Sequence, residues 1–275
     1  MANLSLNLFV LTSQFLLALP LRLWDIRAPC RQRNQGQMLT AEKLFVNGRH
    51  SELLPPTSLT APPGDVLLVE AANQSMRTAL CLVLTGRMRP GAGSVAWNRT
   101  TDLWKLRSFT ALADSPGINE PEPHLRVLDL VAEDLALIPR RTRPRVRAGE
   151  WLSEQGMANL SDLWIEQLEP ADRMDLLIRL ALADTAVQLL VVDSPDRHQA
   201  EPGTWLPALE AAAQGTAAEG TGRPVAVVAA VASLPAGWNG AACRAGNAAE
   251  APAPDSDPDA GDVDTEAPVD SEAAA

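Results

Sequence analysis

The chain has 275 residues, 46% of them hydrophobic, which is enough for one large domain or two small ones with a buried core. The net charge is −11, but nine acidic residues and no basic ones lie from Glu250 onward, so the rest of the chain is nearly neutral. With four Phe, no Tyr and no basic stripe, the composition argues against nucleic-acid binding. The widely separated Cys30, Cys81 and Cys243 form neither a metal-binding spacing nor a disulfide framework, as in a reduced, cytoplasmic protein.

Residues 1–37 form the first predicted segment, which is apolar and uncharged up to Arg22. Polar residues and Pro20 interrupt it, whereas a membrane-spanning helix needs about 20 predominantly apolar residues. It has neither the basic start nor the small-residue cleavage site of a signal peptide. Because Met38 opens the regular stretch "MLTAEKLFVNG", one reading is a loosely packed extension or a misassigned start. A membrane-surface or partner-binding segment and a true signal or anchor remain the alternatives.

From Met38 onward the hydrophobic pattern predicts strands that alternate with helices. In chain order we expect a strand and turn over 41–48, a strand and a Pro-Gly turn over 57–65, a buried strand over 66–69, a helix over 75–85, a strand over 93–97, helical structure over 126–166 broken by a basic loop, a helix over 169–185, a buried strand over 187–193, a helix over 204–214 and a buried strand over 224–231. Continuous apolar strands between helices are typical of a parallel sheet covered on both faces.

The sequence therefore predicts an α/β domain over 38–246, with a helical subdomain at about 126–166. From 247 to 275 the chain is rich in Ala, Pro, Asp and Glu, and we expect it to be disordered because it cannot bury enough apolar surface to offset ordering entropy. Ligands of open α/β sheets bind beyond the carboxyl ends of the strands. The strand ends at Ala71 and Asp193 are therefore the candidate site.

The order of several motifs resembles the nucleotide-binding domain of ABC transporters over roughly Met38 to Leu234. The stretch "RTALCLVLTGRMRPGAGSV" keeps Gly86, Pro90 and Gly93 in register with the family's segment after the phosphate loop, and "LEPADRMDLLIRLALADTAVQLLVVDSPD" is similar to its signature helix and second nucleotide motif. The resemblance implies a P-loop NTPase-like three-layer sandwich: a mostly parallel central sheet, a small antiparallel β subdomain and a helical subdomain.

The phosphate loop itself departs from the family pattern GxxxxGK[ST], whose glycines and lysine surround phosphate. The resemblance places the degenerate nucleotide-binding residues at Ala71, Ala72, Asn73, Gln74, Ser75, Met76, Arg77 and Thr78. Both framework glycines are replaced, and Arg77 keeps the charge of the lysine without its shape. Thr78 keeps the hydroxyl that would hold Mg²⁺, and Asp193 keeps the metal-side carboxylate, so these two are the candidate metal ligands. Arg77 as a surface residue, Thr78 as a local cap and Asp193 as a helix-cap or turn residue are the alternatives.

The other chemical positions of the family are also changed. Ser194 stands at the expected catalytic glutamate and Ala230 at the expected histidine, so no catalytic residue is predicted. The signature-like residues are Leu168, Glu169, Pro170, Ala171 and Asp172; the expected glutamine falls near Asp114 and Ser115, and the adenine-stacking aromatic falls on Asn47 or Gly48. His50, His124 and His198 fall in loop-like stretches and cluster with nothing recognisable. We interpret the basic loop "PRRTRPRVR" as a solvated loop, with contact to a partner or to anionic lipid as the alternative.

Three functions follow as hypotheses. The first is a non-catalytic ABC-type subunit that docks on a membrane permease or a partner ABC subunit, as a homodimer or heterodimer at the inner face of the cell membrane. The second is a weakly active ATPase, which leaves Mg-ATP open as a cofactor although the sequence establishes none. The third is a soluble interaction protein that reuses the fold.

Overall fold

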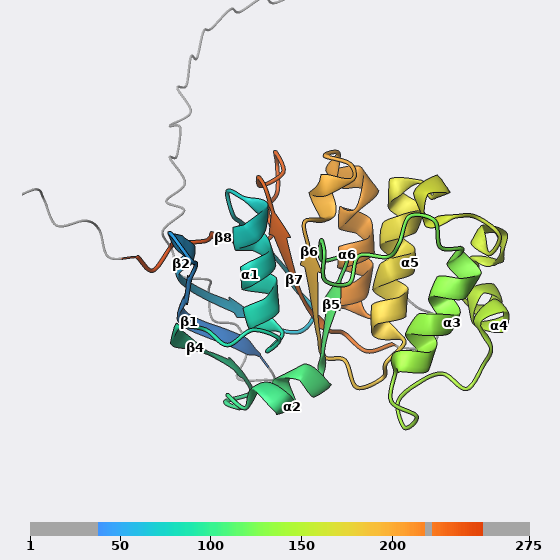
Figure 1. Cartoon of the computed structure of the whole chain (residues 1–275), viewed down its shortest axis with the longest axis horizontal. Coiled ribbons are helices and arrows are strands. Elements are labelled where there is room, and N and C mark those ends of the chain that lie inside the picture. Colours follow the sequence, from blue (N-terminus) through green and yellow to red (C-terminus); the bar gives the residue numbers. More distant parts are fainter. Residues whose placement is uncertain (1–37, 218–221, 250–275) are drawn as a thin grey trace, which may run out of the picture.

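The computed structural model describes residues 38–217 and 222–249, which form two β-sheets with helices packed around them (Figure 1). The N-terminal segment 1–37 and residues 250–275 of the acidic tail lie outside the described residues. The predictions made for these two segments therefore stay predictions. The predicted α/β class, with a mostly parallel central sheet, a small antiparallel sheet and a helical part, is confirmed.

The larger sheet is parallel, with the strand order β5-β6-β7-β3-β8. Its strands are β3 (Val66–Glu70), β5 (Thr110–Ala113), β6 (Leu189–Asp193), β7 (Ala226–Val231) and β8 (Ala241–Arg244). The sequence pattern predicted the buried strands β3, β6 and β7 but missed β8, a mostly exposed edge strand whose "AACR" has no strong strand signal.

The smaller sheet is antiparallel and consists of β1 (Leu39–Asn47), β2 (Glu52–Ala61) and β4 (Ala92–Trp97), in the order β2-β1-β4. Gly93 in β4 has φ +78°, and a Cβ there would lie 2.2 Å from the carbonyl oxygen of Lys43. This close approach of two backbones is possible only without a side chain. It gives a physical reason for the glycine that the resemblance placed in register.

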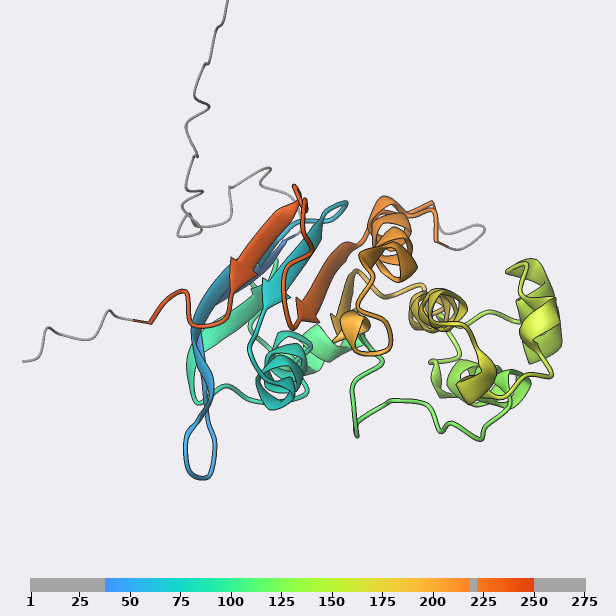
Figure 2. The same ribbon diagram turned by 90° about the horizontal axis from the view of Figure 1, so that it is seen from above.

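Helices lie on both faces of the parallel sheet (Figure 2). They are α1 (Gln74–Leu84), α2 (Leu103–Ser108), α3 (Val127–Leu137), α4 (Ala148–Glu154), α5 (Pro170–Leu182) and α6 (Leu206–Gln214). Successive strand residues face opposite layers: Leu67 packs in the core with α1 and the antiparallel sheet, whereas Leu68 packs with α5 and α6. This alternation gives three layers with two apolar cores.

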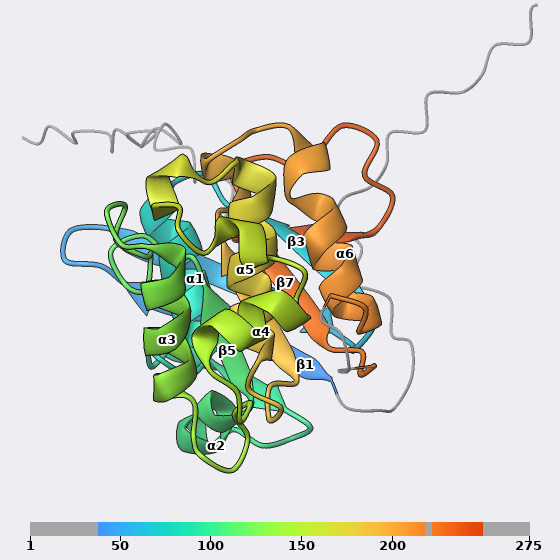
Figure 3. The ribbon, with the colours of Figure 1, turned by 90° about the vertical axis from the view of Figure 1, so that its right-hand side faces the viewer.

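A third apolar core joins α3 and α4 to the outer face of α5 (Figure 3). Between 126 and 166 the chain contains α3, α4 and two short 3₁₀ turns, Ala158–Leu160 and Ile165–Gln167, with the arginine-rich loop between α3 and α4. Since α5 contributes Met174 to the sheet core and Leu177 to the outer core, it links the helical part to the sheet. The same sheet brings the carboxyl ends of β3, β5 and β6 to one edge, where the candidate site lies.

Candidate nucleotide site

In the loop between β3 and α1, the side chain of Asn73 caps the N-terminus of α1. Asn73 has extended backbone angles, and its Oδ1 accepts a hydrogen bond from the backbone N–H of Met76 at 2.8 Å. Asparagine is among the best helix N-cap residues because its short side chain satisfies such an orphan N–H. In an anion-binding helix start these N–H groups point at the ligand. Here one of them is already engaged by a side chain of the loop.

Arg77 lies inside this loop rather than on the surface. It is 8% exposed, and its guanidinium folds back onto the protein. Nε donates to Ser194 Oγ at 2.7 Å, Nη1 donates to the Ala71 carbonyl oxygen at 2.9 Å, and Nη2 donates to Gln74 Oε1 at 3.0 Å. All three guanidinium nitrogens therefore have protein partners. The alternative of a surface residue on the first helical turn is wrong, because the side chain turns inward.

The Gln74 side chain bridges α1 and the end of β6. Its Nε2 donates to Asp193 Oδ1 at 2.9 Å and to Thr78 Oγ1 at 3.1 Å. Its Oε1 accepts from Arg77 Nη2 and lies 3.0 Å from Ser194 Oγ. Both ends of the amide are used, which is the arrangement expected for a polar group withdrawn from water. A glutamine at a position where the family often has glycine thus fills the loop with its own side chain.

Asp193 is the centre of this arrangement and is fully buried. Besides Gln74, it accepts hydrogen bonds from Thr78 Oγ1 at 2.7 Å, from Ser115 Oγ at 2.7 Å and from Ser194 Oγ at 2.8 Å. The carboxylate charge is therefore satisfied within the protein, with the Arg77 guanidinium bonded to two of the same partners. We call the following set the internal polar network: Gln74, Arg77, Thr78, Ser115, Asp193 and Ser194.

The internal polar network does not fit Mg-ATP as it stands. Asp193 and Thr78 offer the oxygen atoms that Mg²⁺ prefers. However, the Gln74 amide N–H groups point at both oxygens, and a donor occupies the side from which a cation would approach. The Arg77 guanidinium likewise binds the loop carbonyl of Ala71 instead of facing outward. Phosphate and metal could enter only if both side chains moved away.

Ser194 has a left-handed backbone, with φ +56°, directly after β6. Its backbone N–H donates to the Ala230 carbonyl oxygen at 2.9 Å. A serine hydroxyl is too weak a base to deprotonate water, so this position offers no general base. Ala230, at the expected histidine position, is buried inside β7 and provides no side-chain chemistry.

Cys81 lies under the same loop, on the buried face of α1. Burial, and secondarily the nearby Asp193 carboxylate, raises the pKa of its thiol well above the ordinary value, although Arg77 opposes this. A nucleophilic cysteine needs a lowered pKa. Cys81 is therefore a core residue and adds no reactive group to the site.

Asp114 forms a second polar cluster beside the first. Its carboxylate is fully buried and binds Nη2 of Arg173 and of Arg197, each at 2.8 Å, and Nε2 of His198 at 3.0 Å. Arg197 also reaches Glu120 at 3.0 Å. Arg173 lies on α5 and Asp114 follows β5, so the cluster links the helical part to the parallel sheet.

The charges around Asp114 determine its protonation. Burial raises the pKa of this carboxyl, but the hydrogen bond between Asp114 and His198 and the charges of Arg173 and Arg197 more than offset it, so the pKa lies below the ordinary value. Ligand atoms of Asp114, Glu120 and His198 lie within 4.8 Å of one another. Because Arg197 already bonds to both acids, a guanidinium takes the place that a cation would need.

The sequence reasoning placed some of these residues and missed others. His198 was expected to cluster with nothing, and this was wrong, because it contacts Asp114. Arg173 and Arg197 were not predicted as site residues, because an isolated arginine in a sequence does not reveal which buried acid it faces. Of the two residues aligned with the family's glutamine, Ser115 joins the internal polar network, whereas Asp114 anchors α5 instead.

None of the signature-like residues belongs to the internal polar network. They begin α5, with Pro170 at the first helical position. Glu169 and Asp172 are exposed there, whereas Leu168 is buried in the helical core. Asn47 and Gly48, at the expected aromatic position, are exposed beside the turn between β1 and β2.

Solved structures share this architecture at low sequence identity. An ATP-binding cassette of an ABC transporter in its ADP conformation is 18% identical, with a TM-score of 0.52, and the match covers 73% of this chain and 83% of that one. CbiO1 from Clostridium perfringens, part of the ABC transporter complex CbiONQ, is 16% identical with a TM-score of 0.51 and coverage of 71% and 78%. These matches show that the chain has the fold of the ATP-binding subunits of ABC transporters.

Parts of the chain are also similar in sequence to two curated ATP-binding export proteins. The chain is 30% identical over 86 residues to the cytochrome c biogenesis ATP-binding export protein CcmA of Tatumella citrea, covering 30% of this chain and 41% of that protein. It is 29% identical over 143 residues to the CcmA of Methylococcus capsulatus, covering 50% and 66%. The chain thus spans less than two thirds of the length of either relative. No protein-family model matches it.

Proposed function

We propose that this chain is an ABC-type ATP-binding-subunit homologue that serves a transport or export system without hydrolysing ATP. One observation carries the proposal: Gln74 and Arg77 fill the phosphate loop with their own hydrogen bonds to Ser194, Asp193 and Ala71. Opening the site would break these bonds and leave buried polar groups unpaired, which costs roughly 1–3 kcal/mol for each group. Nucleotide binding would have to supply that free energy first.

The chemistry of hydrolysis is missing as well. Ser194 offers no base for an attacking water, and such groups typically contribute 10²–10⁴-fold in rate. In the ABC architecture each site combines one subunit's phosphate loop with the other's signature, and here Glu169 and Asp172 would repel the γ-phosphate. A dimer with an active subunit would therefore have both composite sites impaired. This favours a docking or scaffold role over an asymmetric ATPase.

The partners follow from that role. We propose that the chain docks on an integral-membrane permease or on a partner ABC subunit, as a peripheral protein at the inner face of the cell membrane. None of the helices described for this chain is sufficiently long and apolar to cross a membrane. The names of the curated relatives, ATP-binding export proteins, support the transport setting.

A second candidate is a weak Mg-ATP-dependent ATPase. The observation in its favour is that Thr78 and Asp193 survive with their oxygen atoms 2.7 Å apart, next to the positive charge of Arg77. If Gln74 and Arg77 rotated away, these two groups would be the metal ligands. Metal-dependent ATP turnover by the unmodified chain would favour this candidate.

The docking role is tested by gentle detergent extraction of the tagged full chain from its native cells, followed by mass spectrometry of what co-purifies. The proposal predicts a multi-span membrane protein or an ABC subunit in stoichiometric amounts. Recovery of the chain alone would contradict it. The double variant Glu169→Lys/Asp172→Lys provides a control. It changes two exposed side chains that would face only the phosphate of a nucleotide, so the partner should still co-purify with it.

A further inference from the structure

The loop between α3 and α4 forms a cavity of about 870 Å³. Volumes of this size are typical of small-ligand sites. Arginine side chains and apolar side chains from α3, the loop and α4 line it together. It shares no residue with the internal polar network, so it is a separate feature of the fold.

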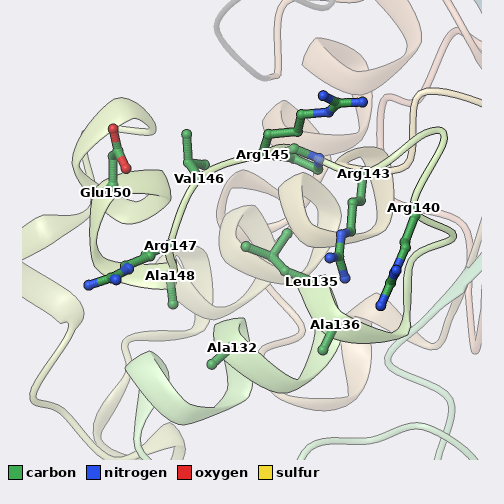
Figure 4. A pocket seen from close by; sticks show the side chains of 11 residues that line it. Ala132, Leu135, Ala136, Arg140, Arg143, Arg145, Val146, Arg147, Ala148 and Glu150 are labelled. Carbon is green, nitrogen blue, oxygen red and sulfur yellow. The ribbon is translucent and has the colours of Figure 1, made fainter.

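The charge in this cavity is unbalanced. Four arginines, Arg140, Arg143, Arg145 and Arg147, line it together with one acid, Glu150. Among the residues that the structure describes, none of the four guanidinium groups has a hydrogen bond or an ion pair (Figure 4). This contrasts with Arg77, Arg173 and Arg197, whose partners are all within the protein. Like charges at close range repel, and an anion would relieve that repulsion.

The side chains divide the cavity into two parts. Figure 4 shows the side chains of Arg140 and Arg143 extending in the same direction, toward Ala136 on α3, with Leu135 pointing into the space between them and α4. Glu150 lies across the cavity on α4, away from this pair. The result is a cationic pair next to an apolar floor formed by α3.

We propose that this cavity binds a phosphate ester with an apolar substituent, its phosphate held by Arg140 and Arg143 and its apolar part against Leu135 and Ala136. Two guanidinium forks can share the three terminal oxygens of one phosphate, whereas a carboxylate is matched by a single fork. The apolar floor distinguishes such a ligand from a bare anion. A soluble phosphate monoester and the headgroup of phosphatidic acid share this chemistry, and either can be the source of the ligand. The assignment goes beyond the proposed function and does not depend on it.

The test uses the full chain and two probes, hexyl phosphate and inorganic phosphate, in isothermal titration. Hexyl phosphate should bind about tenfold more tightly, since burying about two methylene groups accounts for that factor. The Arg140→Gln/Arg143→Gln variant should weaken hexyl phosphate binding at least tenfold. The matched control Arg49→Gln/Arg99→Gln removes the same charge from two exposed arginines elsewhere and should leave binding unchanged.

A second arm identifies the source of the phosphate. Co-sedimentation is measured with phosphatidylcholine vesicles and with the same vesicles containing phosphatidic acid, whose phosphate is a monoester. Binding to the phosphatidic acid vesicles that is lost in the Arg140→Gln/Arg143→Gln variant supports the proposal with a lipid as ligand. Hexyl phosphate binding without vesicle binding supports it with a soluble ester. Equal losses in both double variants, or no preference for hexyl phosphate over inorganic phosphate, would overturn it.

Discussion

Nε of Arg77 donates a hydrogen bond of 2.7 Å to Oγ of Ser194, joining two positions that lie 117 residues apart in the chain. The ABC resemblance places a lysine at the first position and a glutamate at the second. The arginine is long enough to reach back over the loop, and the serine is short enough to leave room for it. The two replacements therefore form one structural unit that closes the phosphate loop.

If Arg77 closes the loop, removing its guanidinium should destabilise the fold. In Arg77→Met the partners Ser194, Gln74 and Ala71 lose their donor in a buried environment, and we expect unfolding to require about 2–4 kcal/mol less free energy. Urea denaturation with an unchanged m-value measures this. The exposed Arg49→Met is the control and should stay within about 0.5 kcal/mol. Equal behaviour of the two variants would show that Arg77 has no structural role.

Restoring the phosphate loop alone should not restore hydrolysis. In Met76→Gly/Arg77→Lys the loop regains a glycine and a lysine, but Ser194 still provides no general base. We expect phosphate release from Mg-ATP at the background rate of a no-enzyme control. Two results together would contradict the role given to Ser194. The double variant would turn over ATP, and adding Ser194→Glu would not raise that rate.

The Asp114 cluster should make stability depend on acid pH. The folded pKa of Asp114 is lowered, so its contribution to stability is fully present above its unfolded pKa of about 3.9 and is lost as the pH falls through the lower folded pKa. Asp114→Asn leaves the buried Arg173 without its counter-charge and should cost about 3–5 kcal/mol at pH 7. The difference in the free energy of unfolding between this variant and the original chain, measured in urea, should shrink as the pH falls below about 3.9. A difference that is constant between pH 7 and pH 3 would exclude this role.

Alanine substitutions at two glycines distinguish the cost of a steric clash from the cost of a strained backbone. Gly93→Ala places a Cβ 2.2 Å from the Lys43 carbonyl oxygen at φ +78°, whereas Gly64→Ala meets nothing within 4 Å at φ +87°. We expect Gly64→Ala to cost about 1 kcal/mol, from the left-handed backbone alone. Gly93→Ala should cost at least about 2 kcal/mol more, because β1 and β4 must separate. Thermal unfolding of the two variants compares them directly, and equal costs would contradict the close approach of the strands.

The core of the fold was predictable from the sequence because β3, β6 and β7 are continuous apolar runs, whereas the mostly exposed edge strand β8 was missed. The loop between β3 and α1 was also predictable from the buried strand before it and the helix after it, whereas its assignment as a degenerate phosphate loop stays a prediction. How the loop is filled was not predictable. Whether Arg77 points outward or inward depends on Ser194 and Asp193, and only the parallel pairing of β3, β6 and β7 brings these residues beside it. Sequence patterns along one segment do not encode such contacts.

The same limit applies to Asp114. Its partners Arg173 and Arg197 lie 59 and 83 positions away, on elements whose packing decides the contact. A buried acid after a strand is visible in a sequence, but the identity of its counter-charge is not. The closed phosphate loop and the Asp114 cluster are therefore findings of the structure, whereas the ABC-type layout could be read from the order of motifs.

We infer that the internal polar network excludes nucleotide from the loop between β3 and α1. The thermal unfolding midpoint (Tm) of the chain in the presence of Mg-ATP tests this inference most directly. A ligand at 100 times its Kd stabilises the folded state by about 2.7 kcal/mol, which for a domain of this size raises Tm by roughly 5–10 °C. The Arg140→Gln/Arg143→Gln background removes phosphate binding at the separate arginine cavity from the measurement. We predict no shift in Tm at millimolar Mg-ATP in this background. A rise of several degrees that disappears in Thr78→Ala would contradict the account.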